Sequence, residues 1–348
     1  MPVQKANCDF ASAVLSTSGQ GVELYISTAP LSRALRTQVE SWLAQLKTVA
    51  LESPTIPQHH TGLEVTGAQR AFIIALHRSS YAKFRPRLCG IATPWKLLSK
   101  TCKTFISVCA QFTAILTATD DHHRLSDDDC LSLHEAGRQF SAALTNPEFK
   151  KCNIWAGVEH VLHSSALLHI ICSLISTAQA KRTRPALQNG LVVRWIGPSP
   201  PQTFCADMDP ENLAKSWEPD LRRDIALRAL QSANKLPPGL VQRGTTYIHD
   251  HAVVHCEAAL LAYLVLNQIP AYPHLASSGD PCFCCVMYGA ALKWEKFTDV
   301  SLRVIAPWAM PEHTPQDVLH VFRILIAHSL ADALWDYRSN PQIGDHCL

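Results

Sequence analysis

Three side chains that commonly bind metals occur in two short segments, His255 in the first and Cys282 and Cys285 in the second. Histidine with two cysteines is a known ligand set for catalytic zinc, which keeps a fourth position open. The two cysteines are three residues apart, so in the first turn of a helix both thiols point to the same side. A helix N-terminus also lowers thiol pKa values and favours the thiolates that bind metal. We therefore predict that these three residues bind Zn²⁺.

Glu257 follows His255 by two residues, which on a helix would separate their side chains by about 200°. Both side chains can reach one pocket only if this segment is the first turn of a helix that faces the pocket with its end. The apolar run that begins at Ala258 fits such a helix. Zinc lowers the pKa of a bound water, and a neighbouring carboxylate can move the proton of that water. Glu257 is thus the predicted catalytic residue.

A closed, structural zinc site is the main alternative to a catalytic one. In that case a fourth protein ligand fills the position left open, and Cys284, Cys256 and His251 are near enough in sequence to supply it. Cys284 would compete with Cys285 only if the ligand pair were Cys282 and Cys284. A third alternative is a chain that binds no metal.

The composition places the protein among folded, globular chains. Of 348 residues 47% are hydrophobic and 17% are charged, which provides a core and argues against global disorder. The net charge of +2 does not by itself indicate a nucleic-acid surface. No export signal is visible, and the apolar stretches are too short to span a bilayer. We expect an intracellular protein, cytoplasmic or nuclear, whose 13 cysteines are mostly reduced and which has no membrane partner.

The first half of the chain is expected to be mostly helical. Apolar residues recur at helical spacing over Ser32–Leu51, Thr104–Ala118 and Ile154–Ala178, and prolines and glycines separate these stretches. Asp127–Asp129 is expected to lie in a solvated loop. A segment rich in proline and basic residues near 181–202 suggests a boundary, so residues 1–190 are predicted to form a helical N-terminal region.

Helices and strands alternate in the second half. Strands are predicted over 191–196, 244–249, 272–277 and 300–304, and helices over 219–235, 255–267, 282–293 and from Thr314 onward. This order is typical of an α/β layered domain with a partly parallel sheet. We expect that domain to comprise residues 203–348.

The two motifs together resemble the zinc-dependent cytidine deaminase superfamily. Its H-x-E and P-C-x-x-C signature matches His255–Glu257 and Pro281–Cys285, within a similar stretch over Val253–Lys293. Ser278, four residues before Cys282, is a further point of resemblance, to a fungal-expanded branch of nucleic-acid-deaminase-like proteins. That branch has Ser-Lys at this step, where this chain has Ser278-Gly279. The resemblance implies a three-layer α/β/α domain with a five-stranded sheet and one zinc ion. It also implies a hairpin before the His-bearing helix and a fifth strand after the last helix, neither of which is plain in the sequence.

The resemblance implies a zinc-dependent hydrolase that deaminates a cytosine- or adenine-type base in a nucleoside, nucleotide or nucleic acid. The expected partner is such a nucleobase-containing substrate, a small molecule or a single strand, and a homo-oligomer is left open. Substrate-binding residues are not identified, although Trp294 and Trp308 could stack on a base if they are not in the core. The alternative from another class is a non-enzymatic, zinc-stabilised scaffold or interaction protein.

Overall fold

The computed structural model describes residues 10–18, 21–29, 33–52, 66–90, 114, 125–144, 170–197, 202–207, 240–244, 246–279, 281–294, 296–297 and 308–339. The chain divides into two compact units. Unit 1 consists of Met1–Arg36 and Val192–Leu348, and unit 2 consists of Thr37–Leu191. Along the chain, unit 2 is therefore inserted between two parts of unit 1.

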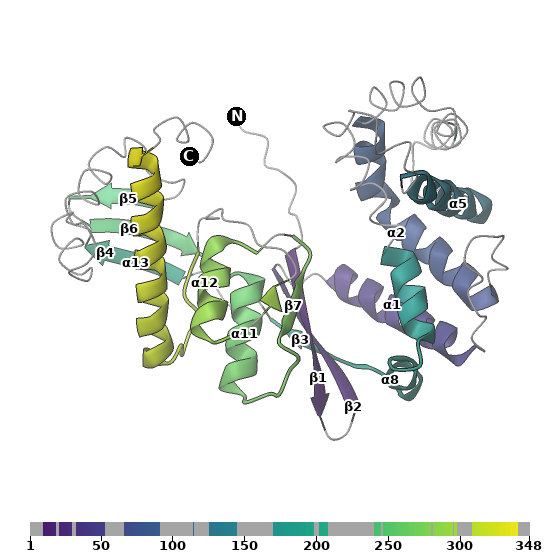
Figure 1. Ribbon diagram of the computed structural model, residues 1–348, viewed down its shortest axis with the longest axis horizontal. Helices are drawn as coiled ribbons and strands as arrows, with labels where there is room; N and C mark the ends of the chain where they lie inside the picture. The colour runs from purple at the N-terminus through teal and green to yellow at the C-terminus, as the bar shows by residue number, and fades with distance from the viewer. Residues whose placement is uncertain are drawn as a thin grey trace. The chain divides into compact units, whose positions relative to one another are not determined.

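Unit 1 contains a five-stranded mixed sheet (Figure 1). In their order across the sheet, the strands are β3 (Val192–Ile196), β2 (Gly21–Ala29), β1 (Phe10–Ser18), β7 (His274–Ser277) and β8 (Lys296–Phe297). β1 pairs antiparallel with β2 and with β7, whereas the β2–β3 and β7–β8 pairs are parallel. The expected mixed α/β class is confirmed, with a sheet that is partly parallel.

The β1–β2 hairpin lies in the first half of the chain, which was expected to be mostly helical, and it corrects that expectation for residues 10–29. Along β1, Ser12, Val14 and Ser16 are buried, whereas Leu15 between them is 42% exposed. This alternation is that of a strand with one covered face, but serines and alanines carry much of it, so the sequence shows little hydrophobic period. The division into residues 1–190 and 203–348 as separately folding parts stays a prediction. The hairpin, which lies within the first part, belongs to the sheet of unit 1.

A second, antiparallel sheet of three strands leads into the candidate site. It has the order β4 (Gln202–Asp207), β6 (Thr246–Ala252) and β5 (Leu240–Arg243). The strand expected over 244–249 is thus present, shifted by two or three residues. β6 ends at Ala252, three residues before His255, so this strand delivers the chain to the site.

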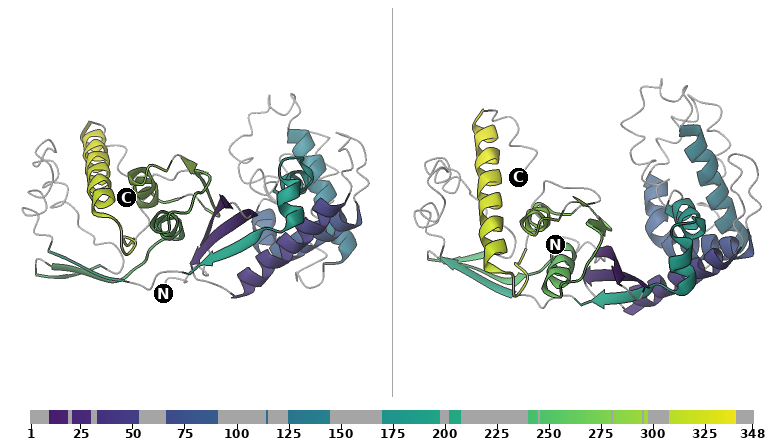
Figure 2. Two further views of the ribbon diagram at one scale, coloured as in Figure 1. Left: turned by 90° about the horizontal axis from the view of Figure 1, so that it is seen from below. Right: turned by 60° about the horizontal axis from the view of Figure 1, so that its bottom comes forward.

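Three helices of unit 1 build the core around the site, namely α11 (Cys256–Leu266), α12 (Phe283–Ala291) and α13 (Gln316–Ser339). α11 contacts β1, β2 and β3, and α12 contacts both α11 and α13 (Figures 1 and 2). α11 is apolar almost all round, as a helix covered on several sides must be. Gly289 lets α12 come close to β8, since a Cβ there would lie 2.7 Å from Cε2 of Phe297. All three helices begin within two residues of their predicted starts.

Unit 2 is helical where it is described. Its described helices include α1 (Arg33–Leu51, whose first residues belong to unit 1), α2 (Gly67–Gly90), α5 (Asp127–Leu144) and α8 (Arg184–Asn189). Residues 170–179 are also helical, in agreement with the later part of the helix predicted over Ile154–Ala178. The helix predicted over Ser32–Leu51 is confirmed as α1. Most of Thr104–Ala118 and the earlier part of Ile154–Ala178 lie outside the described residues, as do the elements predicted over 219–235 and 300–304.

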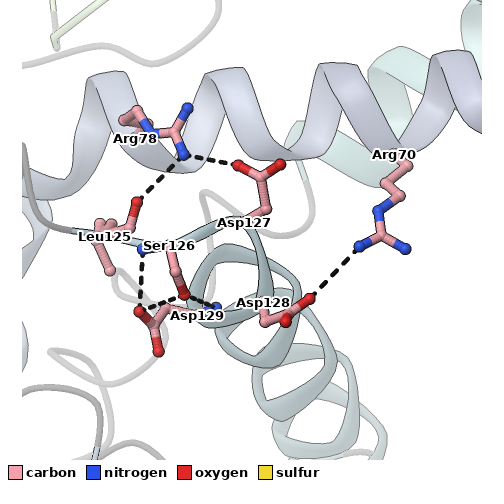
Figure 3. A network of polar contacts seen from close by, with 7 residues as sticks. All are labelled: Arg70, Arg78, Leu125, Ser126, Asp127, Asp128 and Asp129. Atoms are coloured by element: carbon pink, nitrogen blue, oxygen red, sulfur yellow. Dashed lines mark hydrogen bonds and ion pairs between the residues drawn. The ribbon is translucent and has the colours of Figure 1, made fainter.

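The three aspartates Asp127–Asp129 begin α5 and do not lie in a loop (Figure 3). Ser126 and Asp129 form a reciprocal cap, in which each backbone N–H donates to the other side chain at 3.0–3.1 Å. Arg78 and Arg70 of α2 pair with Asp127 and Asp128, respectively. Acidic groups at a helix N-terminus also interact favourably with its dipole. These aspartates therefore have a structural role.

Two histidines meet between α2 and α5, with Nε2 of His77 3.4 Å from Nδ1 of His134. Burial, followed by the charge of His134, lowers the pKa of His77 to about 3, and burial lowers the pKa of His134 to about 4. Both rings are therefore neutral in the folded protein near neutral pH. In the unfolded chain each would titrate near 6.5.

We predict that acid destabilises unit 2 through this pair. As the pH falls from 7 to 5, the unfolded chain binds protons that the folded one refuses, so the free energy of unfolding decreases. Each histidine contributes roughly 2 kcal/mol of loss over this range, at about 1.4 kcal/mol per unit of pH. Amide hydrogen exchange in α2 and α5, corrected for intrinsic rates, measures it. His77→Phe should show a smaller loss than the wild type, and unchanged protection between pH 7 and 5 in the wild type would contradict the prediction.

Candidate metal centre

The starts of two helices carry the predicted ligands. His255 is the N-cap of α11 with an extended backbone (φ −67°, ψ 152°), and Glu257 lies in the first turn. Cys282 is the N-cap of α12 with nearly the same backbone (φ −69°, ψ 159°), and Cys285 lies in the first turn of that helix. The expected placement of each motif at a helix N-terminus is therefore present. Pro281 immediately precedes the second cap, where a missing backbone N–H costs no helical hydrogen bond.

The three ligand atoms form a compact group. Nδ1 of His255 lies 3.3 Å from Sγ of Cys282 and 3.6 Å from Sγ of Cys285, and the two Sγ atoms are 3.5 Å apart. Tetrahedral zinc with ordinary bond lengths holds such atoms about 3.6–3.8 Å apart. Both cysteines are buried, and His255 is half-buried. His255, Cys282 and Cys285 could therefore hold a metal ion, and the softness and spacing of the donors fit zinc.

The thiols do not ionise alike. Hydrogen bonding from Cys285, partly offset by burial and assisted by a hydrogen bond with His255, lowers the pKa of Cys282 to about 5. The same contact with Cys282, together with burial, raises the pKa of Cys285. Near neutral pH the pair therefore holds one thiolate and one thiol. A metal bound by both sulfurs must displace the proton of Cys285, so metal binding is coupled to proton release.

The carboxyl group of Glu257 lies beside the ligand group and is not part of it. Glu257 is only 5% exposed. Its Oε1 accepts a hydrogen bond from Oγ of Ser277 at 2.7 Å, and its Oε2 lies 3.6 Å from Sγ of Cys285. A buried carboxylate next to a metal-binding group is an arrangement suited to proton transfer.

Neither nearby cysteine joins the ligand group. The Cys256 thiol contacts Oγ of Ser12 at 3.2 Å, and burial, followed by the charge of Glu257, raises its pKa to about 12. Burial, followed by the charge of Cys282, raises the pKa of the half-buried Cys284 to about 12. The third alternative ligand, His251, has a side chain outside the described part of the chain. Within that part, the group consists of three ligands.

Ser277 is the residue that sequence reasoning missed. Ser278 was singled out through the resemblance, but it connects strands: its backbone N–H donates to the Ala11 carbonyl at 2.8 Å, and its Oγ accepts from the Ala11 N–H at 2.9 Å. Its neighbour Ser277 contacts Glu257. The one signal in the sequence was the strand predicted over 272–277. Successive residues of a strand face opposite ways, and at its end one serine contacts α11 and the next contacts β1.

The tryptophans near the site pack in the core of unit 1. Trp308 stacks on Phe322, with ring centroids 5.3 Å apart and an interplanar angle of 19°. Trp294 packs against the same core and donates from Nε1 to the Lys296 carbonyl at 3.2 Å. The alternative of core packing is therefore the one that the structure supports for both.

Comparison of the chain with family models, with curated proteins and with solved structures finds no match. The resemblance to the cytidine deaminase superfamily thus stands on its motifs. Within the described residues, none of the helices combines the length and the apolar character needed to cross a membrane.

We predict that the purified protein binds about one zinc ion per chain and that the double variant Cys282→Ser, Cys285→Ser binds essentially none. Two thiolates contribute most of the donor charge, and serine hydroxyls do not replace them. Elemental analysis of protein after gel filtration measures the metal.

Cys284→Ser is the matched control, because it changes a neighbouring thiol on the same helix that lies outside the ligand group. It should keep the metal. Full zinc content in the double variant, or its loss in Cys284→Ser with α12 intact by circular dichroism, would show that the ligands are others.

Proposed function

We propose that the protein is a zinc-dependent hydrolytic deaminase that acts on a cytosine- or adenine-type base. One observation carries the proposal: a buried carboxylate, Glu257, lies against a group of three metal-binding side chains without belonging to it. Three protein ligands are typical of catalytic zinc, whereas structural zinc normally has four. The separation of ligands and acid is thus that expected of a hydrolytic centre.

The residues present fit zinc by their chemistry. Two sulfur donors and one imidazole suit a borderline-soft divalent ion, and the lowered pKa of Cys282 favours its binding. When bound, zinc would lower the pKa of a water molecule so that hydroxide is available near neutral pH. His255, Cys282 and Cys285 would hold it.

Glu257 would supply the proton movements of the reaction. Its carboxylate accepts the proton of the attacking water as oxygen adds to C4 of cytosine or C6 of adenine, and returns it to the ring nitrogen. It then accepts the proton of the added hydroxyl and delivers it to the leaving amino group. The carbon–nitrogen bond breaks, the carbonyl forms and ammonia departs. Oε2, which lies 3.6 Å from Sγ of Cys285, would make these transfers.

The proposed fold is the three-layer α/β/α arrangement of the cytidine deaminase superfamily. In support, α11 and α12 carry the two motifs at their N-termini, and α11 contacts the mixed sheet. The hairpin that the family places before the His-bearing helix has a counterpart in β1–β2, which pairs with β7. In this chain, unit 2 and the second sheet separate that hairpin from α11 in sequence. The hairpin that directly precedes His255 along the chain is β5–β6, which belongs to the second sheet.

The proposed substrate is a nucleobase in a nucleoside, nucleotide or single-stranded nucleic acid. Lys293 and Lys296 are exposed, but they follow the C-terminal end of α12, whereas the candidate ligands lie at its N-terminus, so they do not favour one form of substrate over another. We propose a reducing, intracellular setting, cytoplasmic or nuclear, in which the ligand thiols stay unoxidised, and we leave homo-oligomerisation open. The rival function, a zinc-stabilised scaffold, gives no role to a carboxylate buried beside the ligands.

We predict that Glu257→Gln keeps the metal and the fold but removes most activity. The amide has nearly the same shape but cannot accept the proton, and general acid–base catalysis is typically worth about 10²–10⁴ in rate. The loss should be at the upper end of this range, because the residue acts at more than one step. Ammonia release from bases, nucleosides, nucleotides and oligonucleotides identifies the substrate, and zinc is measured on the same preparation.

Glu312→Gln, a change of an exposed glutamate in unit 1, is the control and should retain wild-type rates. A near-normal rate in Glu257→Gln with zinc retained would reject the mechanism. Loss of zinc in that variant would make Glu257 a ligand and favour a site of another kind. Absence of ammonia release from every substrate class by zinc-loaded wild type would favour the scaffold.

A further inference from the structure

We propose that Ser277 is a positioning residue that keeps Glu257 from becoming a fourth metal ligand. This inference rests on the proposed function, because it explains how one carboxylate can stay a proton acceptor beside the metal. The juxtaposition that carries it is between the end of β7 and the first turn of α11.

The two oxygens of Glu257 have different surroundings. Oε1 accepts the hydrogen bond from Ser277 at 2.7 Å, and Oε2 lies 3.6 Å from a ligand sulfur, that of Cys285. Carboxylate oxygens bind zinc at about 2.0–2.2 Å and are common zinc ligands. A carboxylate so near the metal position therefore needs a restraint if it is to remain unbound. The hydrogen bond to Oε1 fixes the orientation of the carboxyl group and supplies that restraint.

Ser277 is itself held firmly. It is the last residue of β7, and Ser277 and Ser12 of β1 are opposite each other in the antiparallel register. The next residue, Ser278, makes two hydrogen bonds with Ala11, one through its backbone and one through its side chain. β8 pairs with β7 on the other side. A donor on a strand anchored at both edges can hold a carboxylate in one orientation, which a donor on a loose loop cannot.

A merely structural role for the hydrogen bond is the competing explanation. In that case Ser277 only satisfies a buried carboxyl oxygen, which is a general requirement of folded proteins. Its loss would then lower stability and leave the metal ligands and the orientation of Glu257 unchanged. The two explanations differ in the ligand set of the metal, which can be observed without activity.

The experiment uses full-length protein loaded with Co²⁺ in place of zinc, since the visible absorption of cobalt reports the number and type of its ligands. In Ser277→Ala, we expect the freed carboxylate to bind the metal and to change the visible spectrum. Adding Glu257→Ala to that variant removes the intruding ligand, so the double variant should regain the spectrum of Glu257→Ala alone. Ser277→Thr keeps the hydroxyl and should keep the wild-type spectrum.

The zinc-loaded variants provide the second readout. In Ser277→Ala kcat should fall by about 10–10²-fold, the scale on which misplaced catalytic groups act, while zinc content and KM change little. Ser277→Thr should recover most of kcat. Ser16→Ala is the matched control: it removes another buried serine hydroxyl of β1, which donates to the Pro270 carbonyl and not to the carboxylate, and should alter neither spectrum nor kcat.

A wild-type spectrum and kcat in Ser277→Ala would overturn the inference and leave the proposed function standing. A changed spectrum that persists in the double variant would also overturn it, because the new ligand would then not be Glu257. If the wild-type protein binds neither zinc nor cobalt, the proposed function fails and the inference with it. A spectral change that Glu257→Ala reverses, in a protein that deaminates no substrate, would retain the positioning of Glu257 and reject the deaminase.

Discussion

Three acidic side chains lie in consecutive contact in a buried part of unit 1. The sulfurs of Cys282 and Cys285 are 3.5 Å apart, and the carboxylate of Glu257 lies 3.6 Å from the sulfur of Cys285. Negative charges this close cannot all form in a low-dielectric interior. The two thiols respond in opposite directions: hydrogen bonding with Cys285 lowers the pKa of Cys282, and the same contact together with burial raises the pKa of Cys285. A divalent cation could resolve this conflict by replacing a proton, and only the folded chain brings the three candidate ligands together to hold one.

The central strand of the sheet connects the parts of this site, although it begins more than 200 residues earlier in the chain. β1 lies between β2 and β7. Ser12 of β1 contacts Cys256, which stands between His255 and Glu257, while the start of β1 holds the end of β7 that carries Ser277. The relative positions of the ligand-bearing helix and of the serine therefore depend on one strand. Along the chain, unit 2 is inserted between β2 and β3, which are neighbours in the sheet. The inserted chain must therefore begin and end near the same edge of the sheet. A compact folded insertion loses less conformational entropy when this loop is closed than an unstructured one.

Local sequence determined what could be predicted of the metal centre. The spacing of His255 and Glu257 required the first turn of a helix, and the apolar run from Ala258 predicted the helix that follows. The placement of both residues at a helix start was therefore predicted correctly. Ser277 could not be found in this way. Its role depends on the pairing of β7 with β1, and the β1–β2 hairpin was hidden because small serine and alanine side chains, with little hydrophobic contrast, occupy many of its positions. The prediction of a loop for Asp127–Asp129 was wrong for a different reason. A series of polar residues is typical of a loop, but here the three aspartates form the acidic first turn of α5.

The position of Glu257 also bears on the choice between an enzyme and a scaffold. A carboxyl group that is 5% exposed has lost most of its hydration, and uncharged donors such as the Ser277 hydroxyl and the Cys285 thiol are a modest replacement. A scaffold stabilised by zinc would gain by replacing this acid with an apolar side chain or by making it a fourth ligand. An arrangement that does neither forgoes stability beside side chains that could hold a metal ion. Such local sacrifice of stability is characteristic of functional sites, and it favours a functional role for Glu257 over a purely structural one.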